Sequence, residues 1–181
     1  MEINQFVKLA IQEDVKQGDH STISCIPKNS IGSAKLLVKE NGIISGINLA
    51  KEIFSSYDPT ITFKSILKDG QKVSVGDVAF TVCGKSGSIL TIERLVLNVM
   101  QRMSAISTLT NKYVKELKGL NSKILDTRKT TPLNRFLEKE AVKIGGGYNH
   151  RFGLYDMVML KDNHIDFAGG IKQAIEKTNK Y

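Results

Sequence analysis

The chain has 181 residues, of which 41% are hydrophobic and 24% are charged, a composition that excludes an intrinsically disordered protein. No apolar run reaches the ~20 residues of a membrane helix, and the amphipathic, acid-containing start is not a signal peptide. We therefore expect a cytoplasmic protein without membrane association. Two distant cysteines, Cys25 and Cys83, are expected to be buried free thiols of a reducing compartment.

The net charge of +8 is unevenly distributed along the chain. Residues 112–181 contain 14 Lys and Arg against 8 Asp and Glu, which is a net charge of +6. This basic C-terminal part favours an anionic partner, either a nucleic acid, a membrane surface or a small polyanion. A protein that is merely basic is the alternative that charge alone leaves open.

The first ~85 residues predict a small mixed sheet with helices, an α+β unit. Helical spacing of apolar residues predicts a helix over 3–15, and Asn48 is the expected N-cap of a second helix over 48–57. Runs rich in β-branched residues between turn residues predict five strands. These strands are expected at residues 33–40, 42–47, 60–67, 71–75 and 78–84.

A long helix is predicted over residues 88–117. Its apolar stripe is expected to consist of Leu95, Val96, Val99, Met103 and Ile106. Arg94, Asn98 and Gln101 are spaced by four and then three residues, which places them on one helix face. That face is either a solvated polar surface or part of a site.

After Gly119 the pattern changes to alternating strands and helices. Strands are predicted over 123–127 and 155–165, helices over 135–144 and 169–181, and a glycine-rich turn over 145–151. This alternation indicates parallel β-α-β units. The sequence therefore predicts an N-terminal α+β domain (1–118) followed by the first βα units of an α/β barrel (119–181).

Three polar clusters lie where ligands bind in such folds, beyond the carboxyl ends of strands or in the turn between them. They are 126–131 (DTRKTT), 149–151 (NHR) after three glycines, and 161–164 (KDNH). If the strands are adjacent, the cations Arg128, Lys129, Arg151 and Lys161 meet at one mouth. Arginine, lysine, hydroxyl and exposed amide groups together favour a small anionic substrate.

Each cluster has a simpler interpretation by itself. The cations could be solvated, His150 could be a packed residue, and Gly145–Gly147 could end the preceding helix. The sequence has no zinc-type spacing and no serine in a strand-to-helix elbow, which disfavours metal-only and nucleophilic chemistry. No aromatic residues alternate with the cations, which disfavours nucleic acid.

The motifs DTRKTTP, LEKEAVKIGGGYNHRFGLYD and MLKDNHI closely resemble the quinolinate phosphoribosyltransferase family. EDVKQGD, KENGIISGI and TIERLVLNVMQRMSAIST resemble it in the same order, so the resemblance covers essentially the whole chain. It implies phosphoribosyl transfer from phosphoribosyl pyrophosphate to quinolinate with decarboxylation. The products are nicotinate mononucleotide, pyrophosphate and carbon dioxide, in a step of NAD biosynthesis that uses Mg²⁺.

The resemblance also assigns residues. It places Lys129 and Lys161 as the catalytic lysines, and it implies a homodimer in which Arg94 is lent to the neighbouring subunit's site. The Mg²⁺ ligands are expected outside this chain. The residues expected to bind substrate are Arg94, Thr127, Arg128, Lys129, His150, Arg151 and Lys161.

The sequence departs from the family pattern in three respects. Pro-Gly-Leu-Arg is replaced by residues 132–135 (PLNR), and SGIAT is replaced by residues 104–108 (SAIST). Only about 60 residues follow Gly119, whereas an α/β barrel takes ~250. We therefore expect an incomplete barrel with exposed apolar strands, belonging to a fragment, to a chain completed by a partner, or to a degenerate product.

Besides a nucleic-acid-binding module, which is the least favoured, two other functions remain open. One is a non-catalytic anion-binding or dimerisation module derived from the family. The other is a related phosphoribosyltransferase for another aromatic acid.

Overall fold

The computed structural model describes residues 2–181. The helices are α1 (Ile3–Asp14), α2 (His20–Cys25), α3 (Ile47–Tyr57), α4 (Ser86–Glu116), α5 (Arg135–Ile144), α6 (Asp162–Ala168) and α7 (Ile171–Lys180). The strands are β1 (Ile31–Leu37), β2 (Gly42–Ile43), β3 (Thr62–Ser65), β4 (Lys72–Val73) and β5 (Val78–Lys85). The chain divides between His150 and Arg151 into two compact units. The proposed domain boundary after residue 118 lies within the first unit and stays a prediction.

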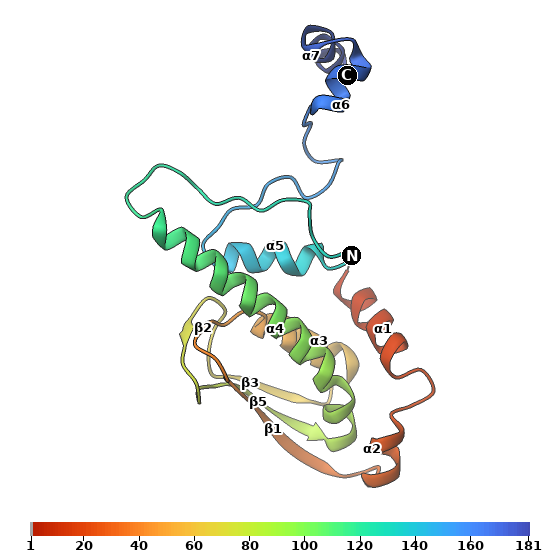
Figure 1. The fold of residues 1–181 in the computed structure, drawn as a ribbon. Coiled ribbons are helices and arrows are strands. Elements are labelled where there is room, and N and C mark those ends of the chain that lie inside the picture. The colour runs from red at the N-terminus through yellow and green to blue at the C-terminus, as the bar shows by residue number, and fades with distance from the viewer. Residues whose placement is uncertain (1) are drawn as a thin grey trace. The chain divides into compact units, whose positions relative to one another are not determined.

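The first unit is built on a three-stranded antiparallel sheet in the order β1-β5-β3. Helices α3 and α4 cover one face of this sheet (Figure 1). Phe80 and Val82 of β5 are buried on that face, whereas Thr81 is in register with the exposed Lys35 and Lys64 of the two outer strands. This alternation is typical of an antiparallel sheet with one solvated face.

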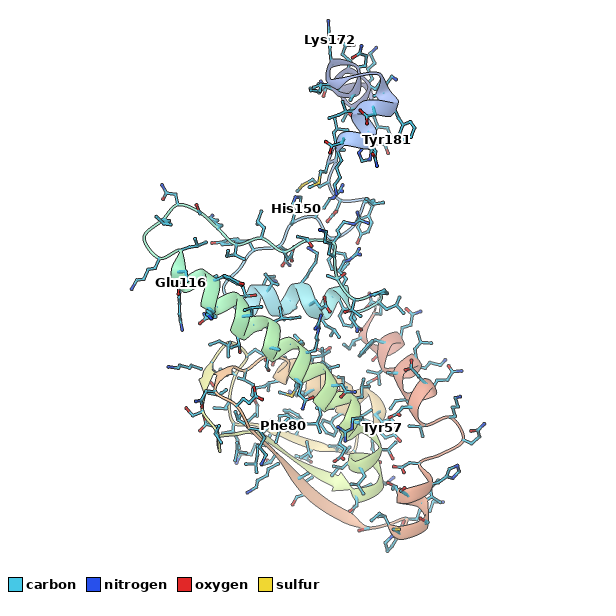
Figure 2. All side chains as sticks on the ribbon, in the orientation of Figure 1. Tyr57, Phe80, Glu116, His150, Lys172 and Tyr181 are labelled. Carbon is cyan, nitrogen blue, oxygen red and sulfur yellow. The ribbon has the colours of Figure 1, made fainter. Side chains whose placement is uncertain are left out.

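The core lies between the sheet and the helices. The Phe80 ring, which lies under the helices (Figure 2), is 4.4 Å from the Phe63 ring and 6.2 Å from the Phe54 ring, measured between centroids. Ile92 and Val96 of α4 belong to the same core and are almost completely buried. The apolar stripe predicted for the long helix is confirmed, since its five members are buried or packed against this core. Arg94, Asn98 and Gln101 are exposed.

Local predictions for a strand, a helix cap and the two thiols were wrong in this unit. The strand expected over 42–47 spans only Gly42–Ile43 (β2), and α3 begins at Ile47. Gly46, with φ +96°, is the N-cap of α3 in place of Asn48, and the Asp69 carboxylate accepts the Ile47 and Asn48 amides at 2.8 and 3.2 Å. The capping oxygen therefore comes from a distant loop, which local sequence does not reveal.

The two thiols are exposed, not buried. Cys25 ends the short surface helix α2. Cys83 lies on the solvated face of the sheet, in register with Ser33 and Thr62.

The second unit consists of an irregular segment followed by α6 and α7, which are joined through Gly169 and Gly170 with φ +91° and +127°. The strand predicted over 155–165 is absent: residues 155–161 form no strand, and α6 begins at Asp162. Met157 and Val158 are exposed, and a parallel strand depends on neighbouring strands for its hydrogen bonds. Among residues 2–181, no helix combines the length and apolar character needed to cross a membrane.

Candidate active site

Two extended segments of the first unit pair in parallel through a bridge between Leu125 and Tyr148. The Asp126 amide donates to the Tyr148 carbonyl (3.0 Å), and the Tyr148 amide donates to the Ile124 carbonyl (2.9 Å). Helix α5 connects the two segments, so they form a minimal parallel β-α-β unit. Parallel pairing after the first segment agrees with the prediction, but its partner was predicted wrongly: Tyr148 lies within the expected turn over 145–151, and the expected strand over 155–165 does not form.

Asp126 and Lys139 form a buried ion pair between the first segment and α5. Asp126 Oδ1 also accepts the His150 amide at 2.8 Å, and Lys139 Nζ donates to the His150 carbonyl at 3.0 Å. With its amide nitrogen facing Asp126, Asn149 donates to Asp126 Oδ2 at 2.7 Å. Asp126 therefore fixes the backbone at His150, on the segment beside α5 (Figure 2), and is a structural member of the DTRKTT cluster.

Residues 126–134, which we call the site loop, are held by several internal hydrogen bonds. Thr127 Oγ1 accepts the Lys129 amide at 3.0 Å. Arg135, the first residue of α5, donates from Nε to Thr130 Oγ1 (3.1 Å) and from Nη2 to the Arg128 carbonyl (3.5 Å). The predicted site residues Thr127, Arg128 and Lys129 therefore lie on an ordered loop that begins beside His150.

The Arg128 side chain has one nitrogen for which no residue in the described part of the chain provides a hydrogen-bond acceptor. Its Nε is buried and has no hydrogen-bond partner. A buried donor on a charged group costs free energy unless it meets an acceptor. The Nε–H of Arg128 is therefore a donor that no described group of the chain accepts.

The glycines at the end of α5 serve packing and capping. A Cβ at Gly145 would lie 2.6 Å from the Ser107 carbonyl oxygen of α4, and Gly146 has φ +93°. The three amides of Gly145–Gly147 donate to carbonyls of α5, at 2.9–3.0 Å. The simpler interpretation of these glycines, that they end the preceding helix, is confirmed, and their amides are not available to an anion because the helix end uses all three.

Two further charged residues, which the sequence did not single out, form an ion pair, and one of them, Glu138, contacts the site loop at Thr131. Arg102 of α4 pairs with Glu138 of α5, with 2.8 Å between Nη2 and Oε1. Glu138 Oε2 accepts the Thr131 amide at 3.3 Å. The sequence signal that could have identified Glu138 is a carboxylate in the first turn of α5, four residues after Asn134.

The remaining predicted site residues are not brought to this loop by any contact described. Arg94 lies eight residues before Arg102, which is ~12 Å along the helix axis. Arg151 belongs to the second unit, where it is buried and its Nη1 donates to the Met157 carbonyl at 3.0 Å. Lys161 is the exposed N-cap residue of α6.

The two small departures from the family motifs have different structural consequences. Leu133 takes φ +66°, a left-handed conformation that favours glycine, and its side chain is exposed. Ala105 is exposed on α4, where alanine is a better helix former than glycine. Only the first departure introduces strain.

The described residues do not form a metal site. Within residues 2–181, no three His, Cys, Asp or Glu side chains are grouped so that they could hold a metal ion.

A parallel β-α-β unit with basic side chains beyond the end of its first strand is the arrangement with which an α/β barrel begins. Two family models match the chain: quinolinate phosphoribosyl transferase, N-terminal domain, over residues 19–104, and the C-terminal domain of the same enzyme over residues 106–181. The chain belongs to the quinolinate phosphoribosyltransferase family. Its fold is an N-terminal α+β domain followed by the first part of the barrel domain.

Individual relatives agree with this assignment. The chain is 46% identical to quinolinate phosphoribosyltransferase [decarboxylating] 1b of Nicotiana tabacum, over 97% of this chain and 50% of that protein. It is 41% identical to a probable nicotinate-nucleotide pyrophosphorylase [carboxylating] of Synechocystis, over 96% of this chain and 59% of that protein. The crystal structure of NadC from Streptococcus pyogenes superposes with a TM-score of 0.93 at 40% identity, over 99% of this chain and 64% of that one. The chain thus spans about half to two-thirds of the length of these relatives.

Proposed function

We propose that this chain carries the quinolinate-binding part of an enzyme that transfers a phosphoribosyl group to quinolinate with decarboxylation. The donor is phosphoribosyl pyrophosphate, and the products are nicotinate mononucleotide, pyrophosphate and carbon dioxide. The unpartnered, buried Nε of Arg128 carries this proposal. A carboxylate of quinolinate is a planar acceptor that matches the guanidinium fork.

The roles of the other residues follow from their chemistry. Thr127 and Lys129 adjoin Arg128 on the site loop and are exposed, so they are available to a second anionic group. We propose that Arg128, Arg151 and His150 orient the dicarboxylate so that its ring nitrogen faces the ribose carbon. Lys129 and Lys161 meet the negative charge of the departing pyrophosphate and stabilise the transition state electrostatically.

The assembly and the cofactor are part of the same proposal. We propose a homodimer in which the exposed Arg94 of one subunit reaches the site of the other. Mg²⁺ is the proposed cofactor, with ligands outside this chain. The cytoplasm is the proposed compartment, which the two free and exposed thiols support. By contrast, the name of a relative from Arabidopsis thaliana includes the word chloroplastic.

The test is a turnover assay of this chain with quinolinate, phosphoribosyl pyrophosphate and Mg²⁺, followed through nicotinate mononucleotide. The proposal expects product formation that Arg128→Ala abolishes and Lys112→Ala, at an exposed position of α4, leaves unchanged. Quinolinate binding without turnover would instead favour a non-catalytic module. Preference for a monocarboxylate such as nicotinate would favour a related phosphoribosyltransferase.

A further inference from the structure

Glu138 of α5 divides its two carboxylate oxygens between two partners. Oε1 accepts from Arg102 Nε (3.1 Å) and Nη2 (2.8 Å), and both donors belong to α4. Oε2 accepts the Thr131 amide (3.3 Å) near the end of the site loop. One buried side chain thus links the long helix to the loop that carries Arg128.

The ionised state of Glu138 follows from its surroundings. Burial by itself raises the pKa of Glu138, but the hydrogen bonds from Arg102 and Thr131, with the charge of Arg102, outweigh it and leave the pKa below its ordinary value. The side chain is 9% exposed, whereas that of Arg102 is 55% exposed. At neutral pH the Thr131 amide therefore donates to an ionised carboxylate. The hydrogen bonds from Arg102 fix the orientation of that carboxylate.

The site loop is consequently held at Asp126 and at Thr131 by adjacent residues of α5. Lys139 anchors the start of the loop through Asp126, and Glu138 anchors Thr131. Only four residues lie between these anchored positions, so a shift at Thr131 is transmitted to Arg128 and Lys129 through a short backbone. The Asp126 anchor is almost completely buried and part of the fold, whereas the Glu138 anchor depends on a half-exposed arginine.

We propose that Glu138 and Arg102 are positioning residues for the anionic substrate: Arg102 orients Glu138, and Glu138 holds the site loop in the geometry that Arg128 and Lys129 need to bind it. This inference rests on the proposed function for the identity of the ligand. Neither residue touches the substrate. Misplacement of a binding group by about 1 Å can reduce its effect by ~100-fold, so a loose anchor weakens binding without unfolding the protein.

The test combines two measurements on the full chain. Hydrogen–deuterium exchange of a peptide covering residues 127–135 reports the order of the loop, and calorimetric titration with quinolinate reports binding. The variants are Glu138→Gln and Arg102→Leu, with Arg102→Lys as the conservative replacement. Glu140→Gln is the matched control, because Glu140 is exposed on the same helix and pairs with Lys143 at 3.0 Å.

We expect faster exchange in 127–135 and roughly ten- to a hundredfold weaker binding for Glu138→Gln and Arg102→Leu. Arg102→Lys should restore most of the affinity, and Glu140→Gln should match the wild type. If Glu138→Gln does not fold, Arg102→Leu decides by itself, since it changes a half-exposed side chain.

Unchanged exchange in both variants, or faster exchange with unchanged affinity, would overturn the inference. A wild-type chain that does not bind quinolinate would refute the proposed function for this chain. Exchange alone would then decide the positioning role: faster exchange supports it, and unchanged exchange refutes it.

Discussion

Lys139 and Asp126 form an ion pair inside the first unit, with side chains only 1% and 6% exposed. The pair also binds the backbone on both sides of the His150 residue. It therefore joins the site loop, α5 and the second extended segment at one point, and the geometry of the site depends on it.

Removal of one partner of this pair should strongly destabilise the protein. We expect Lys139→Met or Asp126→Leu to lower the free energy of unfolding by about 3–5 kcal/mol, because each leaves an uncompensated buried charge. Urea denaturation measures the loss. The double variant should be less destabilised than the sum of the two single variants, and additive losses would show that the two charges act independently.

Leu133→Gly should stabilise the protein. A left-handed conformation costs a non-glycine residue ~1–2 kcal/mol, whereas glycine loses ~0.5–1 kcal/mol through greater freedom of the unfolded chain. We expect a net gain of about 0.5–1 kcal/mol in the free energy of unfolding, measured with urea.

Leu120→Gly is the control for this gain. Leu120 is also exposed, at 63%, and it is not among the residues with positive φ. The Leu120→Gly variant should therefore have a lower free energy of unfolding than the wild type. A loss in both variants would mean that the conformation at Leu133 carries no strain.

Glu138 should contribute a pH-dependent part of the stability. Its pKa in the folded protein is lowered from 4.5, so its contribution is present above pH 4.5 and is lost as the pH falls through the folded-state pKa. Near pH 7 we expect Glu138→Gln to be less stable by about 1–2 kcal/mol, since the Arg102 partner is half exposed. Urea unfolding between pH 7 and 3 measures the difference.

The difference between wild type and Glu138→Gln should shrink below pH 4.5. Glu140→Gln, in which an exposed pair is lost, should change little at any pH. A Glu138→Gln difference that stays constant down to pH 3 would contradict an ionised Glu138 in the folded protein.

Local structure was predicted best where the apolar pattern and the terminating residue both lie within or next to the same helix or strand. The helix expected over 135–144 has the same bounds as α5, because its apolar period ends at Gly145. The strand expected over 155–165 is absent, since parallel pairing depends on distant neighbours that a local pattern does not contain.

The anchors of the site were missed for a related reason. Lys139 lies ~200° around the helix from Leu137, so amphipathic spacing predicts a solvated lysine. It is buried because α5 is also contacted on this side, by Asp126 and His150. Arg128 could be proposed as a site residue from its motif, but Lys139 and Glu138, which hold the site loop, could not.

We propose that the site loop forms a binding site for quinolinate. Calorimetric titration of the 181-residue chain with quinolinate, with nicotinate as the comparator, tests it most directly. We expect binding that is selective for the dicarboxylate and is lost in Arg128→Ala but kept in Lys112→Ala, with the unfolding midpoint unchanged in both. Absence of quinolinate binding by a folded chain, or equal losses in the two variants, would contradict it.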